Sequence, residues 1–392
     1  MRTLRLAVVL TAGALALSAC GNSANKDGKD TSASSAQVKI VATTTQICDY
    51  VTQIATDTSP NATLTLNKTD PAGKKTTVGA AEDKAKSTIN LTCLLAPNAS
   101  AHEHEMTPAQ SKALANADLM LVSGVDLEHF LDDAVKSTGF KGTMGVTSGI
   151  LSSKDVDDIT KVKEAETSLP YKVDRGITKV NIAKWPFPPE QGESEPEFRF
   201  DPHVWTSPRN ASVQVRNIGS FLDKASPANK GLFDKHVSAY SKTIDDFDAW
   251  AKKSLDSVPV NHRVLFSSHD AFGYFAKNYD VKFIGAAMSD FNNQQDATAD
   301  KIAESAAEVK KSGARAIFAE NSNNSKSIEA VAKAAGVKAI VGDDALYGDS
   351  LGPDGSEGAT YVGSIVHNVT NLVKAWDGTV AKLPGSLKTA TK

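Results

Sequence analysis

Four short apolar runs in the second half of the chain decide the fold: RVLFSS (263–268), VKFIGAA (281–287), ARAIFAE (314–320) and VKAIVGD (337–343). They alternate with longer segments in which apolar residues recur at three- and four-residue steps, the spacing of an amphipathic helix. The first half of the chain shows the same rhythm in VKIVAT (38–43), INLTCLL (89–95) and LMLVSG (119–124). Strands that alternate with helices predict parallel sheets with crossover helices, so we predict an α/β fold in each half.

Two stretches interrupt this rhythm. Residues 58–88 are rich in Thr, Lys and Asp and contain Pro60 and Pro71. Residues 152–200 are polar and include a Pro/Glu cluster, WPFPPEQGESEPEF (185–198). Such composition is typical of surface insertions or long loops, and we interpret both stretches in this way.

One long periodic segment lies between Pro227 and Pro259, with its apolar residues at helical steps. A helix of about 30 residues would be roughly 45 Å long at 1.5 Å per residue. Because this segment separates the two α/β halves, we predict two lobes joined by one long rigid helix. The expected parts are an N-terminal lobe (38–226), a linking helix (227–258) and a C-terminal lobe (259–392). A helix packed inside one lobe is the alternative.

The N-terminus has the features of an export signal. Arg2 and Arg5 precede an apolar run that ends in Leu-Ser-Ala-Cys at Cys20. Such a run is too short to span a bilayer comfortably. The cysteine directly after Leu-Ser-Ala resembles the lipobox of bacterial lipoproteins. We therefore expect a lipoprotein signal peptide (1–19), a lipid on Cys20 and a flexible polar tether (20–37), with a simple cleaved signal as the alternative.

Composition narrows the class of protein further. The chain has 392 residues, which predicts two or three domains, and a formal net charge of −3. No basic field therefore points to nucleic acid. Two cysteines remain besides Cys20, namely Cys48 and Cys93. An exported protein meets an oxidising compartment, so we predict a disulfide between them.

Three of the eight histidines occur in loops suited to ligand binding. His102 follows the run 89–95, His203 lies in a loop that begins a helix, and His269 lies at the carboxyl end of a strand. Open α/β sheets bind their ligands beyond the carboxyl ends of parallel strands, and imidazole suits zinc and similar ions. Four other histidines, His129, His236, His262 and His367, are not expected to bind a metal, and for His236 and His367 a solvated or capping role is expected.

Four motifs around these residues resemble one known family, the zinc/manganese ABC-transporter solute-binding lipoproteins. HEHEMTP (102–108) resembles its His-x-Tyr-Glu-x-Thr-Pro stretch, and DPHVWTSPRNA (201–211) is similar to its Asp-Pro-His-Val-Trp motif. SHDAFGYFAKNY (268–279) and LYGDSLGPDGSEGATYVGSIVHN (346–368) resemble the third and the C-terminal motifs. The resemblance covers most of residues 38–376, apart from the two expected insertions.

The resemblance implies four metal ligands: His102, His203, His269 and Asp349. Two come from each side of the long helix, as a site in a cleft between lobes requires. His104 stands where the family usually has an aromatic residue, so it could act as an additional ligand. Thr206 and Ser207 replace a usual Leu-Asp pair, and no His-rich loop separates the first two motifs.

The carboxylate ligand has alternatives. Asp343 and Asp344 close the last expected strand and are the choice on strand-end geometry alone, whereas the resemblance aligns Asp349 with the family's ligand. Glu320, after the run ending in IFAE, also resembles a family position, and we expect it to orient a ligand from outside the coordination sphere.

Carriage of a metal is the function that this pattern favours. Three imidazoles and one carboxylate fill a tetrahedral sphere and leave little room for an activated water. We find no HExxH, Gly-x-Ser-x-Gly or phosphate-loop motif. The resemblance implies a non-enzymatic, monomeric, extracytoplasmic receptor, lipid-anchored to the cell membrane. Such a receptor would deliver Zn²⁺, or alternatively Mn²⁺, to an ABC permease; nitrogen-rich ligation favours zinc. The alternatives are a zinc hydrolase with His104 or Glu105 as base, and an adhesin with a structural metal.

Overall fold

The computed structural model describes residues 36–392, except 82, 190–193, 197, 287–297 and 391–392. The expected signal peptide, Cys20 and almost all of the tether therefore lie outside the described residues. Residues 35–392 form one compact unit, which contains both sheets. In this described part, no helix combines the length and the apolar character needed to cross a membrane.

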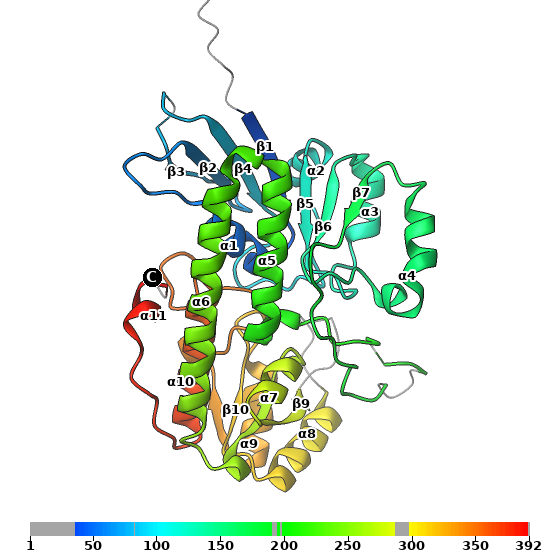
Figure 1. Cartoon of the computed structure of the whole chain (residues 1–392). Coiled ribbons are helices and arrows are strands. Elements are labelled where there is room, and N and C mark those ends of the chain that lie inside the picture. Colours follow the sequence, from blue (N-terminus) through cyan, green and yellow to red (C-terminus); the bar gives the residue numbers. More distant parts are fainter. Residues whose placement is uncertain (1–35, 82, 190–193, 197, 287–297, 391–392) are drawn as a thin grey trace, which may run out of the picture. The chain divides into compact units, whose positions relative to one another are not determined.

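The N-terminal half forms a seven-stranded sheet in the order β3-β2-β4-β1-β5-β6-β7 (Figure 1). Every pair is parallel except the antiparallel β2–β3 edge. Its strands are β1 (Ala36–Ala42), β2 (Leu64–Thr69), β3 (Lys75–Gly79), β4 (Ser87–Cys93), β5 (Leu119–Val122), β6 (Thr143–Val146) and β7 (Lys172–Asp174). The helices of this half are α1 (Thr45–Ala55), α2 (Pro108–Ala115), α3 (Leu131–Thr138), α4 (Ser153–Glu166) and α5 (Pro208–Ala225), which follows the short 3₁₀ helix η1 (Val204–Thr206).

The C-terminal half forms a smaller parallel sheet in the order β11-β10-β8-β9. Its strands are β8 (Val264–Ser267), β9 (Lys282–Ala286), β10 (Ala316–Phe318) and β11 (Lys338–Ile340). They fall within the four apolar runs that predicted them. Helices α7 (Gly273–Asn278), α8 (Ala299–Ser312) and α9 (Lys326–Ala335) connect them, as crossover connections must.

The predicted long helix is present as α6 (Lys230–Leu255), which has 26 residues and is therefore about 39 Å long. A 3₁₀ turn, η2 (Pro227–Asn229), precedes it, so the helix begins and ends slightly inside the expected limits. It packs against α5, α1, α10 (Tyr361–Ala375) and α11 (Gly385–Ala390). Figure 1 shows it running from the level of the large sheet to that of the small one. The predicted α/β architecture, with two parallel-sheet lobes and one long helix, is confirmed.

The structure differs from our interpretation of residues 58–88. This stretch holds β2, β3 and the start of β4, and β2 lies inside the large sheet, paired in parallel with β4. Leu64 and Leu66 are buried in the core, while most of the residues around them are polar. Two apolar side chains were too few to stand out in a Thr/Lys-rich sequence. Only β3, an exposed edge strand, has the surface character that we expected.

Residues 152–200 also contain regular structure, namely α4 and β7. Helix α4 buries only Asp155, so it has no apolar stripe by which a helix could have been recognised. Asp155 accepts hydrogen bonds from the Arg175 guanidinium, whose nearest nitrogen lies 2.8 Å away. This ion pair connects α4 to the chain after β7, and a polar contact takes the place of apolar packing.

The predicted disulfide is present between Cys48 in α1 and Cys93 at the end of β4, with a Cα–Cα distance of 5.7 Å. Both residues lie close to the carboxyl edge of the large sheet. The bond therefore fixes the start of α1 to the point where the chain leaves β4 towards His102.

Candidate metal centre

The four residues expected to bind metal come from loops at the carboxyl ends of strands in both sheets. His102 follows β4, and His203 stands at the start of η1, directly before α5. His269 lies two residues beyond β8, and Asp349 lies in the loop between β11 and α10. The structure brings these four side chains together, although they are far apart in the sequence.

One potential ligand atom from each residue lies within 4.8 Å of the others, and all four residues are buried. The Nε2 atom of His203 is 3.1 Å from that of His102 and 3.2 Å from that of His269. Asp349 Oδ1 is 3.3 Å from His269 Nε2 and 3.5 Å from His203 Nε2. Three imidazole nitrogens and one carboxylate oxygen can together coordinate one divalent metal ion in a tetrahedral arrangement.

The charges at this cluster are strongly coupled. Burial alone would lower the pKa of His203, but Asp201 and Asp349 outweigh it and raise this pKa to about 9. Burial likewise opposes protonation of His269, yet Asp349 raises its pKa to about 10. For His102 burial dominates, and its pKa falls well below the usual value. The pKa of Asp349 is held well below its usual range because the neighbouring histidines outweigh the effect of burial.

His203 is oriented by its neighbour Asp201. The Asp201 carboxylate accepts hydrogen bonds from the backbone N–H of His203 at 3.0 Å and from its ring Nδ1 at 2.9 Å. In the neutral ring Nδ1 therefore keeps the proton, and loss of the second proton leaves the Nε2 lone pair facing the other histidines. A carboxylate behind a ligating histidine also raises its basicity. We did not single out Asp201 from the sequence, although its place in Asp-Pro-His was a usable signal.

Two aromatic side chains, Trp185 and Phe198, cover the cluster, and we call them the aromatic cover. The Phe198 ring is 5.5 Å from the His102 ring, and the Trp185 ring is 6.1 Å from the His203 ring. The two cover rings are 5.1 Å apart, and both residues are buried. The cover comes from the stretch that we interpreted as a surface loop, and its sequence gave no sign of contact with the histidines.

A tyrosine in α7 of the small-sheet half is hydrogen-bonded to the chain segment that carries the aromatic cover. The Tyr274 hydroxyl accepts a hydrogen bond from Ala183 N at 3.0 Å and donates one to Asp201 O at 2.9 Å. Asp201 N donates in turn to Ala183 O. The Tyr274 hydroxyl thus connects both ends of the segment that carries the aromatic cover to the small-sheet half, which also contains His269.

Two further carboxyl groups are buried near His269. Burial raises the pKa of Glu320 to about 8 and that of Asp270 to about 7. Neither Glu320 carboxylate oxygen has a hydrogen-bond partner among the described residues. A side chain on Gly348 would overlap the Glu320 carboxylate, so glycine at this position makes room for it. Glu320 lies outside the four-residue group, and its role as an orienting residue stays a prediction.

The other candidates are not members of the four-residue group, although the His129 ring lies 6.1 Å from the His102 ring. The ring of His104 packs against Phe130 with a centroid distance of 5.0 Å and is not part of the four-residue group. Asp343 and Asp344, the alternative carboxylates, are exposed. The other histidines are outside the group as well: His129, His236, His262 and His367.

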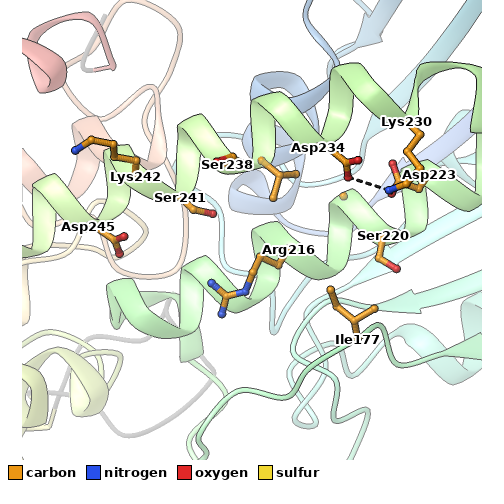
Figure 2. Close-up of a pocket in the computed structure, with 12 residues that line it drawn as sticks. Ile177, Arg216, Ser220, Asp223, Lys230, Asp234, Ser238, Ser241, Lys242 and Asp245 are labelled. Carbon is orange, nitrogen blue, oxygen red and sulfur yellow. Dashed lines mark hydrogen bonds and ion pairs between the residues drawn. The ribbon is translucent and has the colours of Figure 1, made fainter.

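A separate groove of about 930 Å³ lies between α5 and α6. Figure 2 shows that it is lined by charged and hydroxyl side chains. Its Lys230 already pairs with Asp223 at 2.6 Å and with Asp234 at 2.9 Å. No member of the metal cluster lines it, so this groove is not part of the candidate site.

Comparison with known proteins agrees with this geometry. The family model described as "Zinc-uptake complex component A periplasmic" (ZnuA) matches residues 80–375. "Zinc-binding protein TroA" of Treponema pallidum is 29% identical over 76% of this chain and 87% of its own length. "Manganese-binding lipoprotein MntA" of Bacillus subtilis is 27% identical over 96% of this chain and 99% of its own length. The solved TroA structure covers 87% of this chain and 99% of its own, with a TM-score of 0.59 at 24% identity, and shows the same fold.

Two parallel-sheet halves, one long helix and a buried cluster of three histidines and one aspartate define a metal-binding solute receptor. The chain belongs to the ZnuA family of zinc-uptake components. It is the substrate-binding component of a metal ABC transporter, in a family of solute-binding proteins that are not enzymes. Family membership sets aside the zinc hydrolase that the sequence had left as an alternative.

Proposed function

We propose that this chain captures one divalent ion, Zn²⁺ in preference to Mn²⁺, through His102, His203, His269 and Asp349. The observation that carries the proposal is the single buried group that these four side chains form. Three nitrogens and one oxygen suit zinc, which accepts four ligands, better than manganese, which prefers six and mostly oxygen ligands. The relatives named above include both a zinc-binding and a manganese-binding protein, so the metal requires a direct test.

The ion is the cargo of the protein in this proposal. A receptor of this kind releases its ion to a membrane-embedded ABC permease, which is the partner that we propose. MntA of Bacillus subtilis is named a lipoprotein, and Leu-Ser-Ala-Cys at 17–20 resembles a lipobox, so we propose a lipid anchor on Cys20 at the outer face of the cell membrane. Membrane fractionation should show that Cys20→Ala releases the protein or leaves its precursor unprocessed. Unchanged fractionation would contradict the anchor.

Elemental analysis of protein purified without added metal, followed by zinc and manganese competition, tests the capture of metal. We expect one ion per chain and tighter binding of zinc. The ion should exchange with added metal, whereas the structural ion of an adhesin would not. Manganese bound more tightly than zinc would overturn the choice of metal, and the absence of stoichiometric metal would overturn the receptor function.

Alanine variants test the ligands. His102→Ala, His203→Ala, His269→Ala and Asp349→Ala should each weaken zinc binding by several orders of magnitude. His236→Ala is the matched control, because His236 lies on α6 and its ring contacts the backbone oxygen of Ile54 rather than the cluster. His104→Ala should have a small effect. If Asp343→Ala or Asp344→Ala abolished binding and Asp349→Ala did not, the proposed carboxylate would be wrong.

A further inference from the structure

The two carboxylate oxygens of Asp349 have different surroundings. Oδ2 accepts a hydrogen bond of 2.6 Å from the hydroxyl of Ser100. Oδ1 has no hydrogen-bond partner among the described residues and is the oxygen nearest to His203 and His269. Ser100 and Asp349 are both buried, and they are 249 positions apart in the sequence. One oxygen therefore accepts a hydrogen bond from the protein, and the other faces the His203 and His269 imidazoles.

The direction of this hydrogen bond follows from the groups around the hydroxyl. A carboxylate can only accept, so the Ser100 O–H must donate. Ser100 Oγ also lies 3.3 Å from the backbone N–H of His102, from which it accepts. The hydroxyl proton is thus free to point at Oδ2. Hydrogen bonds to a charged acceptor are short and strong, and 2.6 Å is typical of an O–H···O⁻ pair.

The backbone around Asp349 is fixed independently of Ser100. The Gln46 amide donates to Asp349 O at 3.0 Å, and Leu351 N donates to the Thr45 hydroxyl at 2.8 Å. Asn98 N donates to Leu351 O at 3.1 Å. Because the backbone is held at Asp349 and again at Leu351, the Ser100 bond acts mainly on the rotation of the carboxylate.

We propose that Ser100 is a specificity-determining residue that makes Asp349 a ligand through one oxygen only. With Oδ2 hydrogen-bonded to Ser100 and turned away from His203 and His269, the site offers three nitrogens and one oxygen, a coordination number that suits zinc. An ion that prefers more ligands and more oxygen, such as Mn²⁺, loses the second carboxylate oxygen. This inference rests on the proposed role of Asp349 as a ligand. It names the residue that sets the preference between the two metals.

The test compares the wild type with Ser100→Ala. We expect the ratio of the manganese Kd to the zinc Kd to fall about tenfold, as when one charge-assisted hydrogen bond is replaced by a bond to the ion. The ratio is measured by competition against a chromophoric chelator for each metal. X-ray absorption at the zinc edge should show four ligands in the wild type and one additional oxygen in Ser100→Ala.

Two control variants separate this role from general support of the loop. Thr45→Ala removes a hydroxyl that holds the same segment without touching the carboxylate, and it should leave the metal ratio unchanged. Ser100→Thr keeps the hydroxyl and should retain the wild-type ratio. An unchanged ratio and coordination number in Ser100→Ala would overturn the inference, as would equal shifts in Ser100→Ala and Thr45→Ala. Wild-type protein that binds neither metal would instead overturn the proposed function.

Discussion

The two sheets of this protein hold their metal-site residues in different ways. The large sheet has seven strands, and the Cys48–Cys93 disulfide fixes the point where the chain leaves β4 towards His102. The small sheet has four strands, of which β10 and β11 have three residues each, and part of its packing is a separate cluster made mostly of Ala and Val. The large-sheet side of the site therefore has a covalent cross-link beside it, whereas the small-sheet side is held by non-covalent packing alone.

The two sides of the site also differ in their buried carboxyl groups. On the small-sheet side, Asp270 Oδ1 and both Glu320 oxygens are buried without a hydrogen-bond partner among the described residues. An unpaired buried carboxyl group is costly, and a nearby cation reduces this cost. From this difference we expect a bound ion to stabilise the small-sheet side more than the large-sheet side.

The largest effect on folding stability should come from the ion itself. At a free zinc concentration a thousandfold above Kd, binding should stabilise the folded protein by about 4 kcal/mol. Hydrogen exchange measured by mass spectrometry should show stronger protection of β8 and β10 than of β1 and β4. Equal protection of both sheets would break the comparison.

The second effect concerns the large sheet alone. Replacement of both Cys48 and Cys93 by Ser removes a cross-link between α1 and β4, which should cost about 3 kcal/mol of stability. Urea unfolding measures the loss, and hydrogen exchange should locate it in β1 and β4. If β8 and β10 were destabilised equally, the two sides would not be independent. Peptide mass spectrometry of the unreduced wild type provides the control for the bond.

The third effect is the pH dependence of zinc binding. His203 and His269 have pKa values of about 9 and 10 without an ion, so both carry protons at pH 7 that zinc must displace. Affinity should therefore fall up to about a hundredfold for each pH unit between 9 and 7, since two protons compete. Calorimetry in buffers of different ionisation enthalpy should detect nearly two protons released. A simple titration near 6.5, the ordinary histidine value, would contradict these shifts.

The same shifts predict the opposite trend for the ion-free protein. A histidine whose pKa is raised by folding stabilises the folded state below the unfolded pKa, and this contribution is lost as pH rises through the folded pKa. We therefore expect the ion-free protein to lose stability between about pH 6.5 and 10. Urea midpoints measured with a chelator present, across that range, check the sign.

The smallest effect concerns the aromatic cover. Phe198→Ala removes the ring that lies 5.5 Å from His102, a contact worth about 1 kcal/mol. Zinc should then be extracted by a chelator roughly fivefold faster. Phe198→Leu keeps an apolar side chain over the cluster, so its extraction rate should lie between those of the wild type and Phe198→Ala. An unchanged extraction rate would mean that water reaches the ion by another route.

Much of the fold could be predicted because its strands are local patterns. The runs at 263–268 and 314–320 contain strands, and the spacing after Pro227 predicted α6. Strand β2 could not be recognised, because Leu64 and Leu66 do not form an apolar run and are buried only when β2 pairs with β4. Helix α4 was missed for a related reason, because its buried contact is an ion pair and not an apolar stripe.

The metal site, like the fold, could be predicted only in part from the sequence. The four expected ligands were identified because their motifs resemble a known family, and the structure brings them together. Ser100 could not be identified, because its partner Asp349 is distant in sequence and a serine in a polar loop carries no signal of its own. The aromatic cover was hidden likewise, since only the folded chain places Trp185 and Phe198 over the histidines.

The order of the four site residues along the chain has a consequence for biogenesis. They occur at positions 102, 203, 269 and 349, and the last is the carboxylate that lies near all three imidazoles. A chain synthesised from its N-terminus cannot assemble the complete cluster until Asp349 has been added. Earlier intermediates present only imidazoles, and contacts between residues so distant in sequence form slowly. Assembly of the complete four-residue cluster is thus a late event in folding, because it requires residues from both halves of the chain.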